Sequence, residues 1–148
     1  HHKYKPKCRC IRCREPKQKA IDYDSVEMKV MEYDASNGKE FFISFDDVKN
    51  DLILGFCRLR FPSASMREEI TTTSAIIREL HVNGMAVAIG AIGDVQHKGY
   101  GGKLLAKAEE IARSAGKKKM VVISGVGVRE YYKKKSYNKQ GPYMVRDL

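Results

Sequence analysis

Three cysteines stand close together near the start of the chain, in the order Cys8, Cys10 and Cys13. Thiolates at this CxCxxC spacing reach one metal ion from a single tight turn, so the segment predicts a zinc site. Structural zinc takes four ligands, and Cys57 is the one further cysteine that the chain offers. Two alternatives stay open: Cys57 as an ordinary buried residue of the apolar run 52–59, and an iron–sulfur cluster in place of zinc.

A glycine-rich segment, 96–102 (QHKGYGG), stands directly before the most regular helical pattern of the chain. Glycine has no Cβ, so the backbone N–H groups of such a turn approach an anion closely at the N-terminus of a helix. Lys98 and Lys103 add positive charge there. The segment is not a P-loop, because it has no Gly-Lys-Ser/Thr triplet. It predicts a site for a pyrophosphate-bearing ligand, with an ordinary tight turn as the alternative.

The elements that must position these residues follow from hydrophobic periodicity. Alternation with a period of two predicts strands over 26–33 and 40–45, joined as an antiparallel hairpin by the turn 34–38. Further strands are expected over 52–61 and 75–82. The first half of the chain therefore indicates an antiparallel meander.

The second half of the chain mixes helix and strand. Apolar residues at helical spacing predict an amphipathic helix over 101–115, which ends at Gly116. The apolar run 120–123 predicts a strand that is buried on both faces, followed by a short helix over 129–134 and one or two strands within 137–145. This order is typical of one α/β or α+β domain with a mixed sheet.

Size and charge limit the class of protein. With 148 residues, of which 43% are hydrophobic, the chain has room for one domain with a real core. The net charge of +10 is concentrated at the two ends, with +7 in 1–19, +7 in 117–148 and −4 in 20–116. This excludes a uniformly basic, histone-like protein and favours a polyanionic partner at the ends. The lysines of 117–119 and 133–135 are the candidate contacts, with a solvated surface as the alternative.

Two features argue against a membrane or secreted protein. The longest apolar run, 84–93, is far shorter than the ~20 residues of a membrane-spanning helix. No apolar stretch within 3–19 resembles a signal peptide. We therefore expect a cytoplasmic protein with no membrane partner.

The start of the chain divides it into two parts. His1 and His2 are typical of an affinity-tag remnant. We expect 1–20 to be this remnant and a cysteine-rich linker, and 21–148 to be the folded domain, cut from a longer protein. Both a monomer and a homo-oligomer are compatible with the sequence.

The motif Q-x-x-G-x-G, after a strand and at the head of an amphipathic helix, resembles the acetyl-CoA pyrophosphate loop of the GNAT N-acetyltransferase superfamily. More narrowly, the chain resembles the C-terminal acetyltransferase domain of the Elongator catalytic subunits, the tRNA carboxymethyluridine synthases. The segments that carry this resemblance are CRCIRCRE (8–15), RELHV (78–82), QHKGYGGKLL (96–105), VISGVGVREYYKKKSY (122–137) and QGPYM (140–144). The resemblance implies a GNAT-like mixed, mostly antiparallel sheet flanked by helices, preceded by a zinc-knuckle linker.

The resemblance also implies where acetyl-CoA binds. In this fold the fourth strand splays from the fifth, and its unpaired amides hold the pantetheine arm and the thioester carbonyl. The residues that match this edge are Glu79, Leu80, His81 and Val82, with His81 favoured as a backbone contact rather than a base. The residues that match the pyrophosphate loop are Gln96, Gly99, Tyr100, Gly101 and Gly102.

The same resemblance implies the catalytic and metal-binding residues. Tyr132 reaches the thioester sulfur, where a phenol can protonate a departing thiolate. Tyr131 faces either the substrate or the core. A zinc ion at the junction with the preceding domain is held by four cysteines, which are Cys8, Cys10, Cys13 and Cys57.

The implied reaction belongs to a larger enzyme. Acetyl-CoA is cleaved to supply the two-carbon unit for 5-carboxymethylation of the wobble uridine of tRNA. The full enzyme pairs the acetyltransferase domain with a radical S-adenosylmethionine domain that carries an iron–sulfur cluster. This chain carries no such domain, so we expect it to need that domain and tRNA as partners.

Two other functions remain as alternatives. The first is a protein or small-amine N-acetyltransferase, for which Glu79 is the nearest candidate base. The second is a zinc-dependent nucleic-acid-binding module with a degenerate acetyltransferase fold, which would not bind acetyl-CoA.

Overall fold

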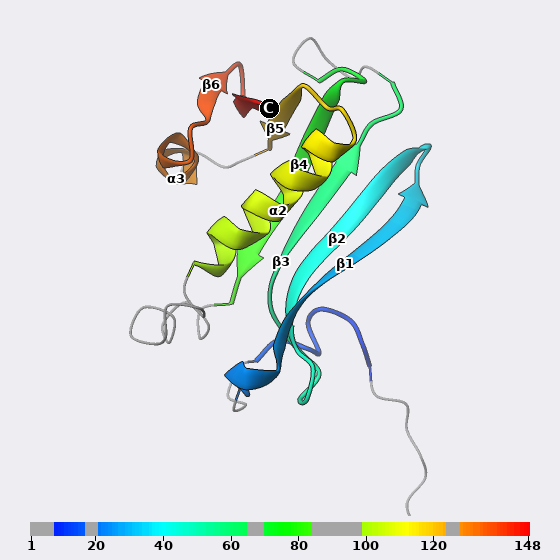
Figure 1. Ribbon diagram of the computed structural model, residues 1–148, viewed down its shortest axis with the longest axis vertical. Helices are drawn as coiled ribbons and strands as arrows, with labels where there is room; N and C mark the ends of the chain where they lie inside the picture. The colour runs from blue at the N-terminus through cyan, green and yellow to red at the C-terminus, as the bar shows by residue number, and fades with distance from the viewer. Residues whose placement is uncertain (1–7, 17–20, 65–69, 84–98, 124–127) are drawn as a thin grey trace, which may run out of the picture.

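The structure is a computed structural model that describes residues 8–16, 21–64, 70–83, 99–123 and 128–148. In these residues seven strands form one sheet in the order β1-β2-β3-β4-β5-β7-β6, and helix α2 packs across one face (Figure 1). All neighbouring strands are antiparallel except β4 and β5, which are parallel. The elements are η1 (Tyr23–Ser25), β1 (Val26–Ala35), β2 (Gly38–Asp47), β3 (Leu52–Phe61), β4 (Ser74–Val82), α2 (Tyr100–Ser114), β5 (Lys119–Val122), α3 (Arg129–Lys134), β6 (Asn138–Gln140) and β7 (Tyr143–Asp147). This arrangement confirms the predicted mixed, mostly antiparallel α/β fold.

The predicted elements lie within two residues of their expected bounds. The strand expected to be buried on both faces is β5, in which Met120, Val121 and Val122 are at most 1% exposed. Within the described ranges, no helix is both long and apolar enough to cross a membrane. The apolar run 84–93 lies outside the described residues.

The hairpin between β1 and β2 shows how local chemistry fixes a turn. Ser36 and Asn37 form its loop with φ values of 49° and 60°, the left-handed conformation that short hairpin turns favour. Arg60 of β3 donates hydrogen bonds to the carbonyl oxygens of Ala35 and Ser36, both at 2.9 Å. A Cβ on Gly38 would lie 2.7 Å from Arg60 Nη2, so the glycine is what allows this arginine to reach the turn.

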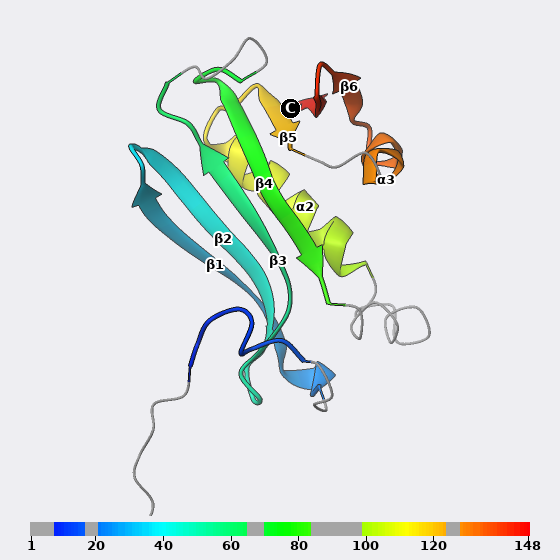
Figure 2. The same ribbon diagram turned by 180° about the vertical axis from the view of Figure 1, so that it is seen from behind.

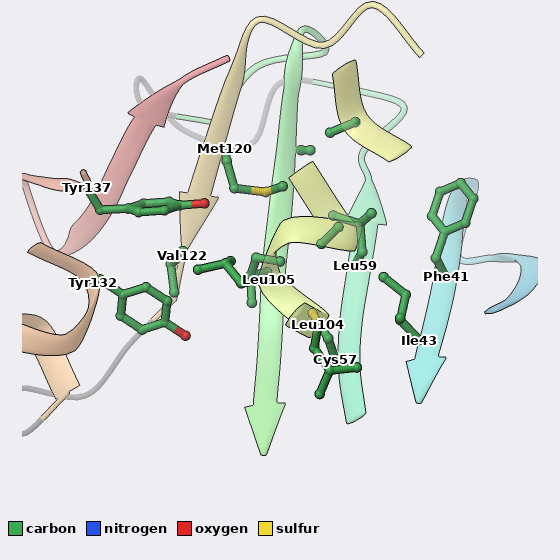
Figure 3. Close-up of a cluster of buried hydrophobic side chains, with 14 of the residues drawn as sticks. Phe41, Ile43, Cys57, Leu59, Leu104, Leu105, Met120, Val122, Tyr132 and Tyr137 are labelled. Carbon is green, nitrogen blue, oxygen red and sulfur yellow. The ribbon is translucent and has the colours of Figure 1, made fainter. Parts of the chain in front are cut away.

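The main core lies between α2 and the sheet. The apolar stripe of α2 buries Leu104, Leu105, Ala108 and Ala112 almost completely. Opposite them stand side chains from the sheet, among them Phe41 and Ile43 of β2, Cys57 and Leu59 of β3, and Met120 and Val122 of β5 (Figure 3). Burial of each leucine contributes about 1.5–3 kcal/mol, so this stripe fixes α2 against the sheet.

The opposite face of the sheet carries an aromatic cluster. In the view from behind, β1 to β4 stand in front of α2 (Figure 2). The rings of Phe42 and Phe56 stack at a centroid distance of 5.3 Å, and His81 lies 5.7 Å from Phe56. The guanidinium of Arg58 covers both phenylalanine rings, at 5.6 and 5.8 Å. These side chains therefore pack against one another on the face of the sheet opposite α2.

A buried polar group ties α2 to the last strands. Tyr137 is 1% exposed, and its hydroxyl donates a 2.7 Å hydrogen bond to Oε2 of Glu109 on α2. Arg146 of β7 donates to the same oxygen at 3.0 Å. Burial, and then the contact with the Glu109 carboxylate, raises the pKa of Tyr137, so the phenol remains a donor. Helical periodicity does not identify Glu109 as buried, because a charged residue beside the apolar stripe is normally predicted to face solvent.

We predict that Glu109→Gln lowers the free energy of unfolding by about 1–3 kcal/mol, because it removes a buried charge that two donors stabilise. Urea denaturation monitored by circular dichroism measures this. The matched control is Glu110→Gln, whose side chain is 66% exposed and pairs with Lys107 on the surface of the same helix, with an expected change below about 0.5 kcal/mol. Equal unfolding free energies for the two variants would show that the Glu109 cluster does not stabilise the fold.

Candidate functional site

The parallel pairing between β4 and β5 stops halfway along β4. The two strands are in register only from Ser74 opposite Lys119 to Ile77 opposite Val122. Strand β4 then continues to Val82, paired on its other side with β3 (Figure 1). In the part of the chain that the structure describes, residues 78–82 therefore have no strand partner on the β5 side. We call this stretch the open edge of β4.

The direction of two backbone amides at the open edge follows from the pairing with β3. The amide of Asn83 donates to the carbonyl of Leu54 at 2.8 Å, so it faces β3. Successive amides of a strand alternate in direction, which turns the N–H groups of Leu80 and Val82 toward the open side. These two residues supply donors for a ligand that lies along the edge.

The other two residues expected at this edge point elsewhere. The same alternation turns the amides of Glu79 and His81 toward β3. Glu79 lies 3.2 Å from Nε of Arg58, and the His81 ring packs near Phe56 on the face opposite α2. Of the four residues expected at this edge, the pairing thus turns the amides of Leu80 and Val82 toward the open side and those of Glu79 and His81 toward β3. The carboxylate of Glu79, the candidate base, lies beside Arg58.

The head of α2 presents backbone donors beside the open edge. Gly99 is the N-cap with φ of 67°, a conformation that glycine adopts without strain. The amide of Lys103 donates to the Gly99 carbonyl at 2.9 Å, so the preceding amides of Gly101 and Gly102 have no acceptor within the helix. The ring of Tyr100 turns into the core, 4.8 Å from that of Phe45. An anion at this point would meet the positive end of the helix dipole.

Gly101 is the point where three elements meet. A Cβ at this position would lie 3.2 Å from the hydroxyl oxygen of Tyr131 on α3 and 3.5 Å from Cγ2 of Val82 on β4. The absence of a side chain therefore lets α3, the open edge and the head of α2 approach one another. Gln96, which the motif places in the same loop, lies outside the described residues.

The two adjacent tyrosines of α3 differ in environment. Tyr132 is 5% exposed, and its ring contacts those of Tyr131 and Tyr137 at centroid distances of 5.2 and 5.6 Å. In Figure 3 its hydroxyl points from α3 toward the α2 side of the sheet. Burial raises the pKa of Tyr132, so its phenol stays protonated at neutral pH. Tyr131 is 37% exposed, and burial together with the Glu109 charge also raises its pKa.

The N-terminal cysteines form a second cluster. The Sγ atoms of Cys8, Cys10 and Cys13 lie within 4.8 Å of one another, so they could hold one metal ion. Cys13 donates its amide to Sγ of Cys10 at 3.4 Å, and this contact, together with the Cys8 and Cys13 thiols, lowers the pKa of Cys10 to about 7. A thiol of low pKa is partly thiolate at neutral pH, which is the form that binds metal.

Cys57 does not join this cluster, contrary to the expectation of a four-cysteine site. It lies in the middle of β3, opposite Ile43 and Leu80, and faces α2 in the main core with 0% exposure (Figure 3). Burial raises the pKa of its thiol to about 12, so the group stays neutral. Cys57 is a small buried core residue, which is the alternative that the apolar run 52–59 left open.

Arginines fix the cysteine segment to the domain. Arg9 pairs with Asp51 at 2.8 Å, and Arg14 lies 3.6 Å from Asp46 and 3.7 Å from Asp51. The amide of Ile53 donates to the Arg14 carbonyl at 2.7 Å. The segment is therefore docked at the β2–β3 turn and is not a free linker. No sequence spacing relates these arginines to Asp51, so the sequence predicted the cysteines but not their anchor.

The chain belongs to the acetyltransferase (GNAT) family, whose sequence profile matches residues 10–137. Over 96% of its length it is 45% identical to the tRNA uridine(34) acetyltransferase of Methanocaldococcus jannaschii and 43% identical to Elongator complex protein 3 of Schizosaccharomyces pombe. The chain spans 28% of the length of each of these relatives.

Solved structures agree with this assignment. An archaeal Elp3 from Methanocaldococcus infernus matches 95% of this chain with a TM-score of 0.83 and 44% identity, over 35% of its own length. A putative N-acetyltransferase from Lactobacillus plantarum matches 78% of this chain with a TM-score of 0.52 and 16% identity. This second match shows the fold alone.

We predict that the three-cysteine cluster binds a tetrahedral metal without Cys57. Titration with Co²⁺, followed by thiolate charge-transfer absorption, should give the same affinity for the unaltered chain and Cys57→Ala. Cys10→Ser should weaken binding by about tenfold or more, because a ligand is lost. Zinc quantitation on the purified proteins gives the second readout. An equal loss of metal in Cys57→Ala would place Cys57 among the ligands.

Proposed function

We propose that this chain is an acetyl-CoA-binding domain whose cofactor lies along the open edge of β4 and ends on the head of α2. The observation that carries the proposal is the close approach of Tyr131 of α3 and Val82 of β4 to Gly101, where no side chain separates them from the backbone of α2. Backbone donors from two elements, with the Tyr131 hydroxyl beside them, suit a thioester joined to a pyrophosphate.

In this proposal, different residues bind different parts of acetyl-CoA. The amides of Leu80 and Val82 donate to the pantetheine arm and the thioester carbonyl. The amides of Gly101 and Gly102 donate to the pyrophosphate, and the loop residues Gln96, Gly99 and Tyr100 complete this end. When bound, acetyl-CoA supplies an activated acetyl group. Its thiolate needs a proton when the acyl bond breaks, and the protonated phenol of Tyr132 is the donor that we assign.

We further propose that the domain works on tRNA. Both relatives at 45% and 43% identity are named for tRNA uridine modification or for Elongator. The exposed basic residues Lys134 of α3 and Lys139 of β6 suit a phosphate backbone. The acceptor is then the wobble uridine, which receives the two-carbon unit for 5-carboxymethylation in the cytoplasm.

The rest of that reaction belongs to further parts of a longer enzyme. We propose that a radical S-adenosylmethionine domain with an iron–sulfur cluster generates the reactive carbon, and that zinc in the cluster of Cys8, Cys10 and Cys13 fixes the junction between the two domains. The docking of this cluster by Arg9 and Arg14 supports a structural role for the metal. Its chemistry is to hold the thiolates in one geometry.

We predict that Gly101→Asp weakens acetyl-CoA binding by about 100-fold or more. The new Cβ would stand 3.2 Å from the Tyr131 hydroxyl, and the carboxylate would occupy the anion site. Isothermal titration calorimetry measures the affinity. The control is Ala106→Asp, which adds the same charge at an exposed position of α2 and should bind normally. Unchanged affinity in Gly101→Asp would refute the assigned site.

We predict that Tyr132→Phe slows acetyl-CoA cleavage by about 10²-fold or more and changes its dissociation constant by less than about threefold, because only the proton donor is lost. Tyr131→Phe is the matched control, with a smaller loss of rate. The alkaline limb of the rate profile should lie above pH 10, since burial raises the pKa of Tyr132 above its ordinary value of 10.0. Equal losses of binding and rate would indicate a packing role.

The same assay, run with and without a tRNA anticodon stem-loop, tests the substrate. We expect the RNA to stimulate turnover and a lysine peptide to remain unmodified. Acetylation of the peptide with no effect of RNA would favour a protein N-acetyltransferase, and absence of acetyl-CoA binding would favour a nucleic-acid-binding module.

A further inference from the structure

The lysine that follows α3 points toward the first turn of α2. Lys135 is the C-cap of α3, and its side chain reaches across to the first turn of α2. A Cβ on Gly102 would lie 3.0 Å from Nζ of Lys135. The ammonium also lies 5.8 Å from the ring centroid of Tyr131, within range of a weak cation–π contact.

This position places a positive charge beside the positive end of a helix dipole. The N-terminus of a helix carries a partial positive charge, and cations are disfavoured there. The first turn of α2 contains no acidic residue and already carries Lys103. In the described parts of the chain, no carboxylate lies within ion-pairing distance of Lys135. Lys135 therefore brings a positive charge to the positive end of the α2 dipole, and none of the described carboxylates pairs with it.

Neighbouring lysines of α3 behave differently. Lys133 pairs with Glu130 on the same helix at 3.2 Å, as expected for an exposed residue in a helix of mixed charge. Lys135 makes no such pair and instead uses the space that the missing side chain of Gly102 leaves open. Gly102 therefore has two roles, since it presents its amide and also admits the ammonium.

We propose that Lys135 is a phosphate-binding residue of this site, whose ammonium neutralises the pyrophosphate held by the amides of Gly101 and Gly102. The inference rests on the acetyl-CoA site proposed above and adds to it a specificity-determining side chain from α3. The pyrophosphate, rather than the 3′-phosphate of the adenosine, is the assigned contact because Nζ lies directly over Gly102. The lysine makes the site selective for the phosphorylated carrier over the bare pantetheine arm.

The test compares Lys135→Met with Lys133→Met, which removes the same charge from the same helix. Calorimetry is run with three probes: CoA, 3′-dephospho-CoA and pantetheine. We expect Lys135→Met to weaken CoA and 3′-dephospho-CoA by the same factor of about 5–30, since one charge-assisted contact at a partly exposed site is lost. Pantetheine binding should not change. Lys133→Met should bind all three probes normally, and Lys135→Arg should restore most of the affinity.

Each contrary outcome has one meaning. Equal CoA affinity in Lys135→Met and the unaltered chain would overturn the role of Lys135 while leaving the acetyl-CoA site intact. A loss for CoA but not for 3′-dephospho-CoA would overturn the pyrophosphate assignment. A loss that extends to pantetheine would show a general disturbance of the fold. Failure of the unaltered chain to bind CoA would overturn the proposed function itself, and this inference with it.

Discussion

The early end of the parallel pairing between β4 and β5 is the constraint on which the rest of the site depends. Four residue pairs hold the two strands together, and the strands then separate while β4 continues along β3. The separation leaves the amides of Leu80 and Val82 on an open edge, and it makes room for the head of α2 beside them. A β5 that stayed paired to the end of β4 would satisfy these donors within the sheet, and the edge would have nothing to offer a ligand.

The sequence predicted the elements well because their signals are local. Period-two alternation predicted the β1–β2 hairpin and helical spacing predicted α2, since each pattern reflects which face of one element is buried. The separation of β4 from β5 has no such signal, because residues 78–82 continue the same strand and only a resemblance to a known family suggested it. The expectation that Cys57 is a metal ligand disagrees with the structure for a related reason. The sequence shows which residue types are available, but the fold decides whether a thiol is buried in the core or lies near the other cysteines.

Contacts between distant segments explain what else the sequence missed. Glu109 lies at the edge of the apolar stripe of α2, and only the fold brings Tyr137 and Arg146 to it. Lys135 belongs to a lysine run that reads as a solvated surface, yet its place at the end of α3 turns it toward Gly102. In both cases one charged residue departs from the pattern of its neighbours, and the departure is visible only in three dimensions.

Helix α2 serves the core and the site at the same time. Its stripe of Leu104, Leu105 and Ala108 is packed in the interior, and its first turn carries the amides of Gly101 and Gly102, which have no acceptor within the helix. Separation of α2 from the sheet would disrupt both the core and the arrangement of its first turn beside β4. Any ligand held at that first turn therefore shifts the folding equilibrium by mass action, by RT ln(1 + [L]/Kd), or about 2.7 kcal/mol at a concentration of 100 Kd. The cellular concentration of the ligand thus helps to set the fraction of the domain that is folded.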